Sequence, residues 1–370
     1  MGGNLMIYVI SSVHPLSDSR IYHRQVLSLA KHYSIKYFAQ EVEGWQAKDV
    51  AYVALPQGKK LQVRLGNCWR LLRASLSREA RVIHFHDPEL LPVGLIAKIF
   101  GKKVVYDVHE NYFKTIRHKP SIPKYLRGVI CILFKMFENL CCRCFDLVLV
   151  VTDELKQHLP GNVHTINNYP HISFTPPVKQ PSRGALKLVY VGLITQPRGV
   201  LNMIEAVKRV TVPVTFDIIG HFNSAEFQHC VEAEIRDLDN IKYVPSIPYS
   251  SFFNHLVQYD VGMMCLLPNP NHVTSLPNKL FEYMAMGMAI LASDFPIWRE
   301  ILDKSGCGVL VDPLDSDAIR EAIERLESNR GDLAQMGRQG QRAYQSLYNW
   351  ESQEKKLLSL YEKMLGEKNA

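Results

Sequence analysis

Long apolar runs are missing from this sequence. Its 370 residues contain no stretch of about 18 consecutive apolar side chains, the length that a membrane-spanning helix needs. The start, MGGNLMIYVISSV, has no basic residues before its apolar segment and no small-residue cleavage site, so it does not resemble a secretory signal. We therefore predict a cytoplasmic protein.

Paired C-x-x-C motifs are also missing. Four of the eight cysteines, Cys131, Cys141, Cys142 and Cys144, share one segment but are interleaved with apolar residues. This pattern favours buried free thiols over a metal site. The aromatic-and-glycine sheet motifs and recognition helices of nucleic-acid-binding proteins are absent as well, so we predict no nucleic-acid partner.

Length and charge indicate two domains. A single hydrophobic core stops growing at about 250–300 residues, and this chain is longer. Residues 1–185 contain 25 Lys and Arg residues against 13 Asp and Glu, whereas the remainder has 18 against 23. Two halves of opposite charge favour two domains with different partners.

The first half contains a strand-helix-strand unit. VIHFH and KVVYDV are short apolar runs typical of buried parallel strands, and polar loops follow both. Since the carboxyl ends of neighbouring parallel strands meet at one edge, six polar residues are expected on the ligand side of the sheet. These are His84, His86, Asp87, Asp107, His109 and Glu110. Their spacing is not that of a helix-borne metal site.

A second polar constellation lies in TSLPNKLFEYMAMGMAILASD, residues 274–294. The apolar spacing predicts a short helix from about Asn278 to Gly287, followed by a buried strand. The backbone of 277–280 at the helix start is suited to hold a diphosphate, with Lys279 adding a charge and Glu282 accepting hydrogen bonds from a ribose. The alternative is an ordinary amphipathic helix whose Lys279 and Glu282 face solvent.

The run PNKLFEYMAMGMAILASD, followed by Pro296, Glu300 and GVLVDP, resembles the carboxyl-terminal signature of the GT-B glycosyltransferases, in particular retaining family 4. This resemblance implies an α/β fold of two Rossmann-like domains whose parallel sheets face across a cleft. It further implies a first domain over 1–170, a linker over 171–186, a nucleotide-sugar-binding domain over 187–348, and a closing helix over 349–370 that returns to the first domain.

The resemblance also implies roles for individual residues. The family has two glutamates eight residues apart; Glu282 matches the second, which holds the ribose, and Thr274 stands at the first position. Arg198 matches one of two basic residues that clamp the diphosphate, and Leu193 stands at the other. His109 matches a histidine beside the transferred sugar.

The predicted site is therefore assembled from both domains. The catalytic set is His109, Arg198, Lys279 and Glu282, and the acceptor or sugar side is Arg20, Asp107 and Glu110. The donor-binding set is Gly192, Arg198, Thr274, Pro277, Asn278, Lys279, Leu280 and Glu282, with weaker candidates for base contacts at His221 and 246–248. No D-x-D pair follows a strand, so neither a metal nor another cofactor is expected.

The implied function is transfer of a sugar from a UDP- or GDP-sugar to a hydroxyl of a saccharide or lipid-linked saccharide, with retention, in surface polysaccharide biosynthesis. A nucleotide-sugar epimerase on the same scaffold is one alternative, since fold does not decide function. A non-enzymatic membrane-binding or nucleic-acid-binding protein is another.

A basic segment favours a membrane surface as partner. Seven basic residues between Lys59 and Arg81 accompany one acid, Glu79, and Trp69, Leu72 and Leu76 share a helical face with Arg70 and Arg73 beside it. Such a helix can lie on the anionic inner face of a membrane. The alternative is a helix packed on the sheet with a solvated basic rim.

Overall fold

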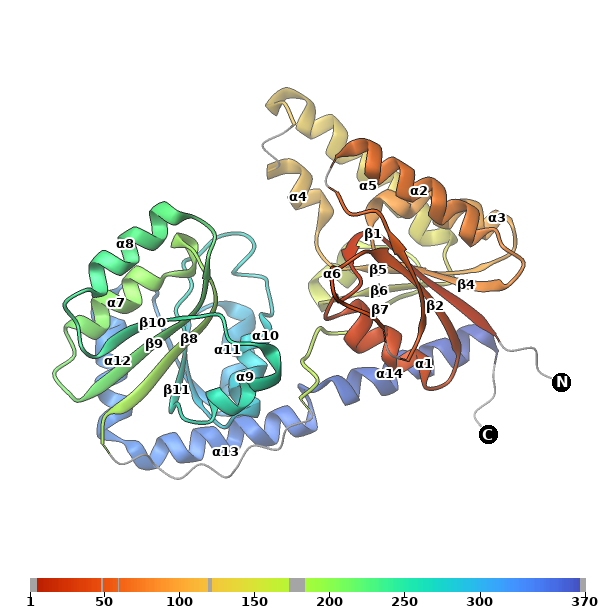
Figure 1. Ribbon diagram of the computed structural model, residues 1–370. Coiled ribbons are helices and arrows are strands. Elements are labelled where there is room, and N and C mark those ends of the chain that lie inside the picture. Colours follow the sequence, from red (N-terminus) through yellow and green to blue (C-terminus); the bar gives the residue numbers. More distant parts are fainter. Residues whose placement is uncertain (1–4, 48, 59, 119–121, 173–183, 367–370) are drawn as a thin grey trace. The chain divides into compact units, whose positions relative to one another are not determined.

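The computed structural model describes residues 5–47, 49–58, 60–118, 122–172 and 184–366 (Figure 1). It divides into two compact units: 1–168 together with 353–370, and 169–352. Most of the predicted linker, and Lys59 of the basic segment, lie outside the described residues. No described helix is both long enough and apolar enough to cross a bilayer.

The first unit is built on a seven-stranded parallel sheet in the order β3-β2-β1-β4-β5-β6-β7. Its strands are β1 (Met6–Pro15), β2 (Ser34–Gln40), β3 (Ala51–Leu55), β4 (Ala80–Phe85), β5 (Lys103–Val108), β6 (Leu147–Val150) and β7 (Val163–Thr165). Its helices are α1 (Leu27–Ala30), α2 (Leu61–Ser75), α3 (Leu91–Ile99), α4 (Tyr112–His118), α5 (Lys124–Cys144) and α6 (Asp153–His158).

The second unit repeats this plan with a six-stranded parallel sheet in the order β10-β9-β8-β11-β12-β13. Its strands are β8 (Leu186–Ile194), β9 (Val214–Phe222), β10 (Ile241–Pro245), β11 (Val261–Met264), β12 (Ala289–Ser293) and β13 (Gly308–Val311). The remaining helices are α7 (Val200–Lys208), α8 (Ala225–Ile235), α9 (Tyr249–Leu256), α10 (Asn278–Ala285), α11 (Pro296–Ser305), α12 (Ser316–Ser328), α13 (Arg330–Ser346) and α14 (Trp350–Leu365). The predicted α/β class with two Rossmann-like parallel sheets is confirmed.

Each unit has its own apolar core, because its central strands are buried on both faces. Every residue of β12 is buried, as is every residue of β6. The larger core cluster lies in the second unit and includes the apolar side of α10. In the first unit a core forms between the sheet and the helices α2, α3 and α5.

Two helical segments of the first unit have irregular features. A π-helical turn, Ile21–Val26, continues into α1, and Asp18 accepts from the backbone N–H groups of Arg20 and Ile21 at its start. In α2 the predicted apolar face is divided: Leu72 packs against the core, whereas Trp69 is exposed. The inward face instead carries Asn67, Leu71 and Ser75.

Helix α14 belongs to the first unit from Gln353 onward. The Gln353 side chain accepts from the backbone N–H of Asn167 at 2.9 Å, and the Tyr361 hydroxyl lies 2.7 Å from Nδ1 of His84. Tyr361 is completely buried. Helix α14 is thus fastened to the sheet of the first unit.

Candidate functional site

The order of the strands locates a binding edge in the second unit. Chain progression runs outward from β8 through β9 to β10, and in the opposite direction from β11 through β12 to β13, so the order reverses between β8 and β11. Ligands of open parallel sheets bind at the carboxyl ends of the strands where this reversal occurs. The turn after β8 and the loop before α10 both lie at this edge.

Lys279 is the most unusual side chain at that edge. It is only 9% exposed, and its Nζ has no hydrogen-bond partner among the described residues. The ammonium lies 4.0 Å from the centre of the Tyr190 ring, a cation–π contact. Burying an amine without a hydrogen-bond partner costs free energy of folding. An anion bound beside Lys279 would offset that cost, so the residue marks a candidate anion site.

Gly192 makes room for that amine. Its φ is +131°, a conformation that side chains rarely adopt, and a Cβ built there would lie 3.2 Å from Lys279 Nζ. The Tyr190 hydroxyl donates to the carbonyl of Leu193 at 2.8 Å, which fixes the turn that follows. The end of β8 is thus shaped around the Lys279 side chain.

Electrostatics at this edge follow from the same burial. Desolvation, followed by the nearby positive charge of Arg198, lowers the pKa of Lys279 to about 7, although Glu282 acts in the opposite direction. Two cationic groups therefore lie close enough to repel each other. A bound diphosphate would relieve this repulsion, because it brings negative charge to both.

The start of α10 adds backbone donors. Pro277 is the N-cap residue, and its carbonyl accepts from the N–H of Leu280 at 3.1 Å. The N–H groups of Asn278 and Lys279 precede that bond and belong to the unpaired first turn of the helix. The Leu280 side chain is completely buried in the core, so this residue anchors the helix. Glu282, one turn further, is half-buried.

Thr274 belongs to a loop that is held from several sides. Its hydroxyl donates to the carbonyl of Pro270 at 3.1 Å, and the indole N–H of Trp298 donates to the carbonyl of Ser275 at 2.8 Å. The Ser293 hydroxyl lies within hydrogen-bond distance of the carbonyls of Met264 and Leu266. This loop therefore presents α10 on a fixed support.

The weaker base-contact candidates lie at the carboxyl ends of neighbouring strands. His221 is near the end of β9, and its Nδ1 is 3.4 Å from the Ser246 hydroxyl, just beyond β10. Both side chains are exposed. They are on the same edge of the sheet as the turn after β8.

In the first unit, Asp107 is the centre of a buried polar cluster. Its carboxylate receives Nε and Nη2 of Arg20 at 2.9 and 2.7 Å and the amide of Gln25 at 2.9 Å. Nδ1 of His86 and Nε2 of His109 lie 3.1 and 3.0 Å from the same carboxylate. Of the five side chains His109 is the most exposed, at 16%, so it is the member that faces outward.

The charges of this cluster are set by burial and pairing. Burial would raise the pKa of Asp107, but Arg20 and His109 hold it well below the usual value, so the group is a carboxylate. Burial lowers the pKa of His86 to about 4 and that of His84 well below its usual value, so both rings are neutral at pH 7. The net result is one ion pair, Arg20–Asp107, with the neutral rings of His84 and His86 beside it.

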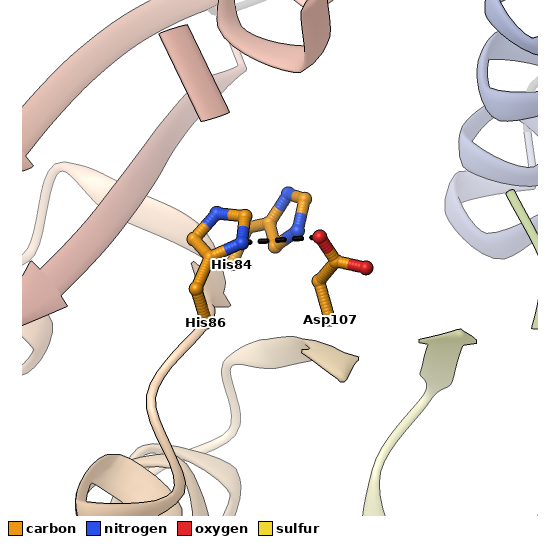
Figure 2. Close-up of side chains that lie close together, drawn as sticks. All are labelled: His84, His86 and Asp107. Carbon is orange, nitrogen blue, oxygen red and sulfur yellow. Dashed lines mark hydrogen bonds and ion pairs between the residues drawn. The ribbon is translucent and has the colours of Figure 1, made fainter. Parts of the chain in front are cut away.

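Figure 2 shows His84, His86 and Asp107, whose potential ligand atoms all lie within 4.8 Å of one another. Nε2 of each histidine has no hydrogen-bond partner among the described residues, which is a feature that a metal ligand would have. The carboxylate, however, is already engaged by the guanidinium of Arg20. A divalent cation there would sit against that positive charge, which disfavours metal binding by this cluster.

The predicted acceptor-side residues differ in their burial. Arg20 is 4% exposed, and its remaining donor Nη1 contacts the carbonyl of Ile166 at 2.9 Å. Arg20 and Asp107 pair with each other inside the domain. Their placement on the acceptor or sugar side stays a prediction. Glu110 is exposed and accepts from the Thr115 hydroxyl at 3.2 Å.

One residue of this edge escaped sequence reasoning. The ring of His14, near the carboxyl end of β1, lies 5.1 Å from that of His109, centre to centre. Its Nε2 is 3.3 Å from Asp87, and its Nδ1 is 3.4 Å from Asp18. Although burial lowers it, the pKa of His14 is raised overall by these carboxylates. The H-x-x-x-D spacing of His14 and Asp18 was the available signal.

Comparison with known proteins gives the family. A family model described as "Glycosyl transferases group 1" matches residues 185–329, and one described as "Glycosyl transferase 4-like domain" matches residues 22–164. The two matches fall on the second and the first unit, respectively. A search of curated proteins finds no match.

Solved structures share the fold over nearly the whole chain. Sucrose-phosphate synthase from Thermosynechococcus elongatus is 17% identical with a TM-score of 0.76, over 99% of this chain and 100% of that one. A glycosyltransferase from Rickettsia africae is 16% identical with a TM-score of 0.76, over 100% of both chains. HepE from Anabaena, solved in complex with UDP, is 14% identical with a TM-score of 0.71, over 98% of this chain and 100% of that one. Through its two domains and their fold, the chain belongs to the group 1 glycosyltransferases with the GT-B fold.

Proposed function

We propose that this glycosyltransferase binds a nucleoside diphosphate sugar at the carboxyl edge of its second sheet and transfers the sugar with retention. The observation that carries the proposal is the buried ammonium of Lys279, which lies beside Gly192 without a hydrogen-bond partner among the described residues. Such a group is costly to the folded protein alone and becomes favourable when an anion reaches it.

The diphosphate would be the leaving group. Lys279, Arg198 and the first N–H groups of α10 would stabilise its developing negative charge, which is the usual source of catalysis in such transfers. Glu282, half-buried one turn further along α10, would accept hydrogen bonds from the ribose hydroxyls. The proposal includes no metal ion, because two cationic side chains take over the neutralising role.

On the sugar side we propose His109 as the contact residue. Asp107 holds its Nε2, and Arg20, Gln25 and His86 in turn hold Asp107. His109 is therefore a contact residue whose orientation is set from inside the domain. We further propose that the acceptor hydroxyl transfers its proton to the departing phosphate, and that the product retains the anomeric configuration.

A UDP-sugar is our first choice of donor and a GDP-sugar the second. HepE, which shares the fold, was solved with UDP and with UDP-glucose. For the acceptor we propose a lipid-linked saccharide used in surface polysaccharide synthesis. WaaG, another protein of the same fold at 12% identity and a TM-score of 0.68, is described as involved in lipopolysaccharide biosynthesis.

The test is a thermal-shift measurement with UDP-, GDP- and ADP-sugars. A ligand at 100 times its dissociation constant adds about 2.7 kcal/mol to the free energy of unfolding. Glu282→Gln and Arg198→Ala should remove most of this gain, whereas Glu321→Gln, a change in an exposed acid of α12, should keep it. Stabilisation of the two site variants equal to that of the wild type would refute the proposed site.

Stereochemistry has a separate test. The anomeric configuration of the product of a UDP-sugar reaction can be read from proton coupling constants. Retention is expected, and an inverted product would remove the mechanism while leaving the donor site intact.

A further inference from the structure

Helix α5 exposes an unusual amount of apolar surface. Six of its large side chains, Tyr125, Val129, Ile132, Leu133, Met136 and Leu140, are between 53% and 80% exposed. They are spaced at i, i+4, i+7, i+8, i+11 and i+15, so they form one stripe along the helix. We call this stripe the apolar face of α5. Large contiguous apolar patches are rare on proteins that have no partner.

The inward side of the same helix is buried against the rest of the first unit. Cys131, Cys141 and Cys142 are buried, and the Glu138 carboxylate is 4% exposed and accepts from the Tyr106 hydroxyl at 3.3 Å. Helix α5 is therefore packed on its unit through this side, and the apolar face lies apart from it. It is a second, outward apolar surface on a helix that already has a core side.

Charges around this face have one sign. The exposed ends of α5 carry Lys124 and Arg143, whereas the only acid of the helix, Glu138, is buried. Helix α3 packs against both α2 and α5, and α2 exposes Arg70 and Arg73 (Figure 1). Apolar side chains bordered by cations are the pattern of a helix that lies in the interface of an anionic bilayer.

Dimensions agree with this arrangement. The 21 residues of α5 span about 30 Å, and no described helix can cross a bilayer, so α5 would lie along the surface and not through it. Neighbouring elements add exposed apolar side chains: Leu61, Leu65 and Trp69 on α2, and Ile99 and Phe100 at the end of α3. A flat membrane surface can contact several parallel helices at once.

A second copy of this chain is a poorer occupant. If the α5 helices of two copies paired, the cations Lys124 and Arg143 of one copy would face cations of the other. This holds for a parallel and for an antiparallel pair. Like charges that face each other across an interface are unfavourable. An anionic lipid surface has no such penalty.

We propose that the apolar face of α5 binds the surface of an anionic phospholipid bilayer. The inference deepens the proposed function and depends on it for its biological meaning, because a transferase acting on lipid-linked acceptors must work at a membrane. It assigns bilayer contact to α5, whereas the sequence points to the basic segment between Lys59 and Arg81.

The experiment is co-flotation of the full chain with phosphatidylglycerol-containing vesicles and with pure phosphatidylcholine vesicles, without any donor. We expect binding to the anionic vesicles, and at least a tenfold lower partition coefficient for Ile132→Ser/Met136→Ser. Ile132→Trp, which keeps the apolar area, should bind as well as the wild type. Leu314→Ser, which removes an equally exposed leucine of the second unit, should also bind normally.

Three results would overturn the proposal. The double serine variant could float as well as the wild type, or the wild type could fail to bind anionic vesicles. The wild type could also form a dimer by analytical ultracentrifugation that the serine changes dissolve, which would give the face to a second copy. The melting temperature of each variant is measured alongside, and Ile132→Trp keeps the comparison valid if a serine variant is unstable.

This test is separable from that of the proposed function. Vesicle binding is measured without nucleotide sugar, and donor stabilisation is measured without vesicles. If the protein binds the donor but not the vesicles, only the membrane inference is refuted. If it binds the vesicles but not the donor, only the proposed donor site is refuted.

Discussion

Burial of the Lys279 amine destabilises the folded protein, and the other interactions of its domain offset this loss. Its pKa, lowered to about 7 by burial and by Arg198, means that near neutral pH the amine is charged in only part of the molecules. In the unfolded chain the group is protonated up to about pH 10. Stability contributed by this site therefore increases as pH rises between these values, because the unfolded state binds more protons there.

The same titration predicts a pH dependence of donor binding. A diphosphate favours the charged amine, so above about pH 7 binding takes up a proton, and the dissociation constant of UDP-glucose should rise toward tenfold per pH unit. Calorimetry from about pH 6 to about pH 9 measures this slope. Lys279→Met should bind weakly at every pH, without the slope, and should melt at a higher temperature than the wild type.

Arg198→Gln is the matched comparison for this slope. It should weaken binding but keep the pH dependence, moved to higher pH, because the charge that lowers the Lys279 pKa is gone. An affinity of the wild type that stays constant across the range would contradict the role given to Lys279.

Asp107 predicts a different kind of sensitivity. It is completely buried and holds Arg20, so Asp107→Asn leaves an uncompensated guanidinium and should destabilise the first unit by about 3–5 kcal/mol. Urea unfolding measures this change. Glu110→Gln, which alters an exposed carboxylate on the same loop, should cost little.

A double variant separates pairing from other effects of the Asp107 change. Asp107→Asn/Arg20→Leu should be less destabilised than the sum of the two single variants, since neither charge is then left alone. If the stability losses of the two single variants simply added up in the double variant, the Arg20–Asp107 ion pair would not explain why Asp107→Asn is destabilising.

Sequence reasoning succeeded where a pattern is local. It located the strand ends that carry Asp107 and His109, and it placed Lys279 in the first turn of a short helix, because these follow from apolar runs and their polar flanks. It placed Arg20 on the acceptor or sugar side by resemblance and did not pair it with another residue. The partner, Asp107, is brought there by sheet order, which no local pattern encodes.

At the scale of elements, α10 is positioned by the helix behind it. Helix α13 contacts α10 and the residues just after it through two glycines: a Cβ on Gly337 would lie 2.2 Å from the carbonyl oxygen of Gly287, which follows α10, and one on Gly340 would lie 3.4 Å from Cα of Met284 in α10. Backbone approaches backbone here, so there is no flexible side chain to yield. The turn at which we propose donor binding therefore depends on small residues remote from it in sequence.

Gly337→Ala should displace the end of α10 and weaken donor binding together with stability. Overpacking of this kind costs about 1–3 kcal/mol. Gly331→Ala, in the first turn of the same α13, has no atom within 4 Å of the added methyl and should behave like the wild type. Thermal unfolding with and without UDP-glucose measures both effects. Equal stability of the two variants would show that α13 can move away without consequence.

The split of α2 shows a limit of periodicity. Trp69 and Leu72 lie three residues apart and seem to belong to one face, yet Leu72 meets the core and Trp69 does not. The centre of the inward face is Leu71, between two small polar residues, Asn67 and Ser75, that are buried through specific hydrogen bonds. Periodic analysis counts apolar residues and so misplaces a face whose buried positions are partly polar.

At the scale of the whole molecule, the chain passes through the first unit, completes the second, and returns with α14 to the first. The return is secured by a buried hydrogen bond between Tyr361 and His84, two residues from His86 of the Asp107 cluster. The His84 and His86 rings are stacked with centroids 4.6 Å apart. The last helix thus supports the inner side of the residues that hold His109.

Tyr361→Phe removes this hydroxyl and leaves Nδ1 of a buried, neutral His84 without its partner. An unsatisfied buried group costs about 1–3 kcal/mol, so the first unit should open more often while the second is unaffected. Hydrogen exchange followed by mass spectrometry should show faster exchange in β4 and in α14 from Gln353 onward, with β8 and α10 unchanged. Tyr344→Phe is the comparison in the second unit, since its hydroxyl donates to the carbonyl of Pro170 at 3.1 Å, and it should leave exchange in β4 unchanged. If Tyr361→Phe instead accelerated exchange equally in both units, α14 would be coupling them into one cooperative structure, and the two cores could not be treated as independent.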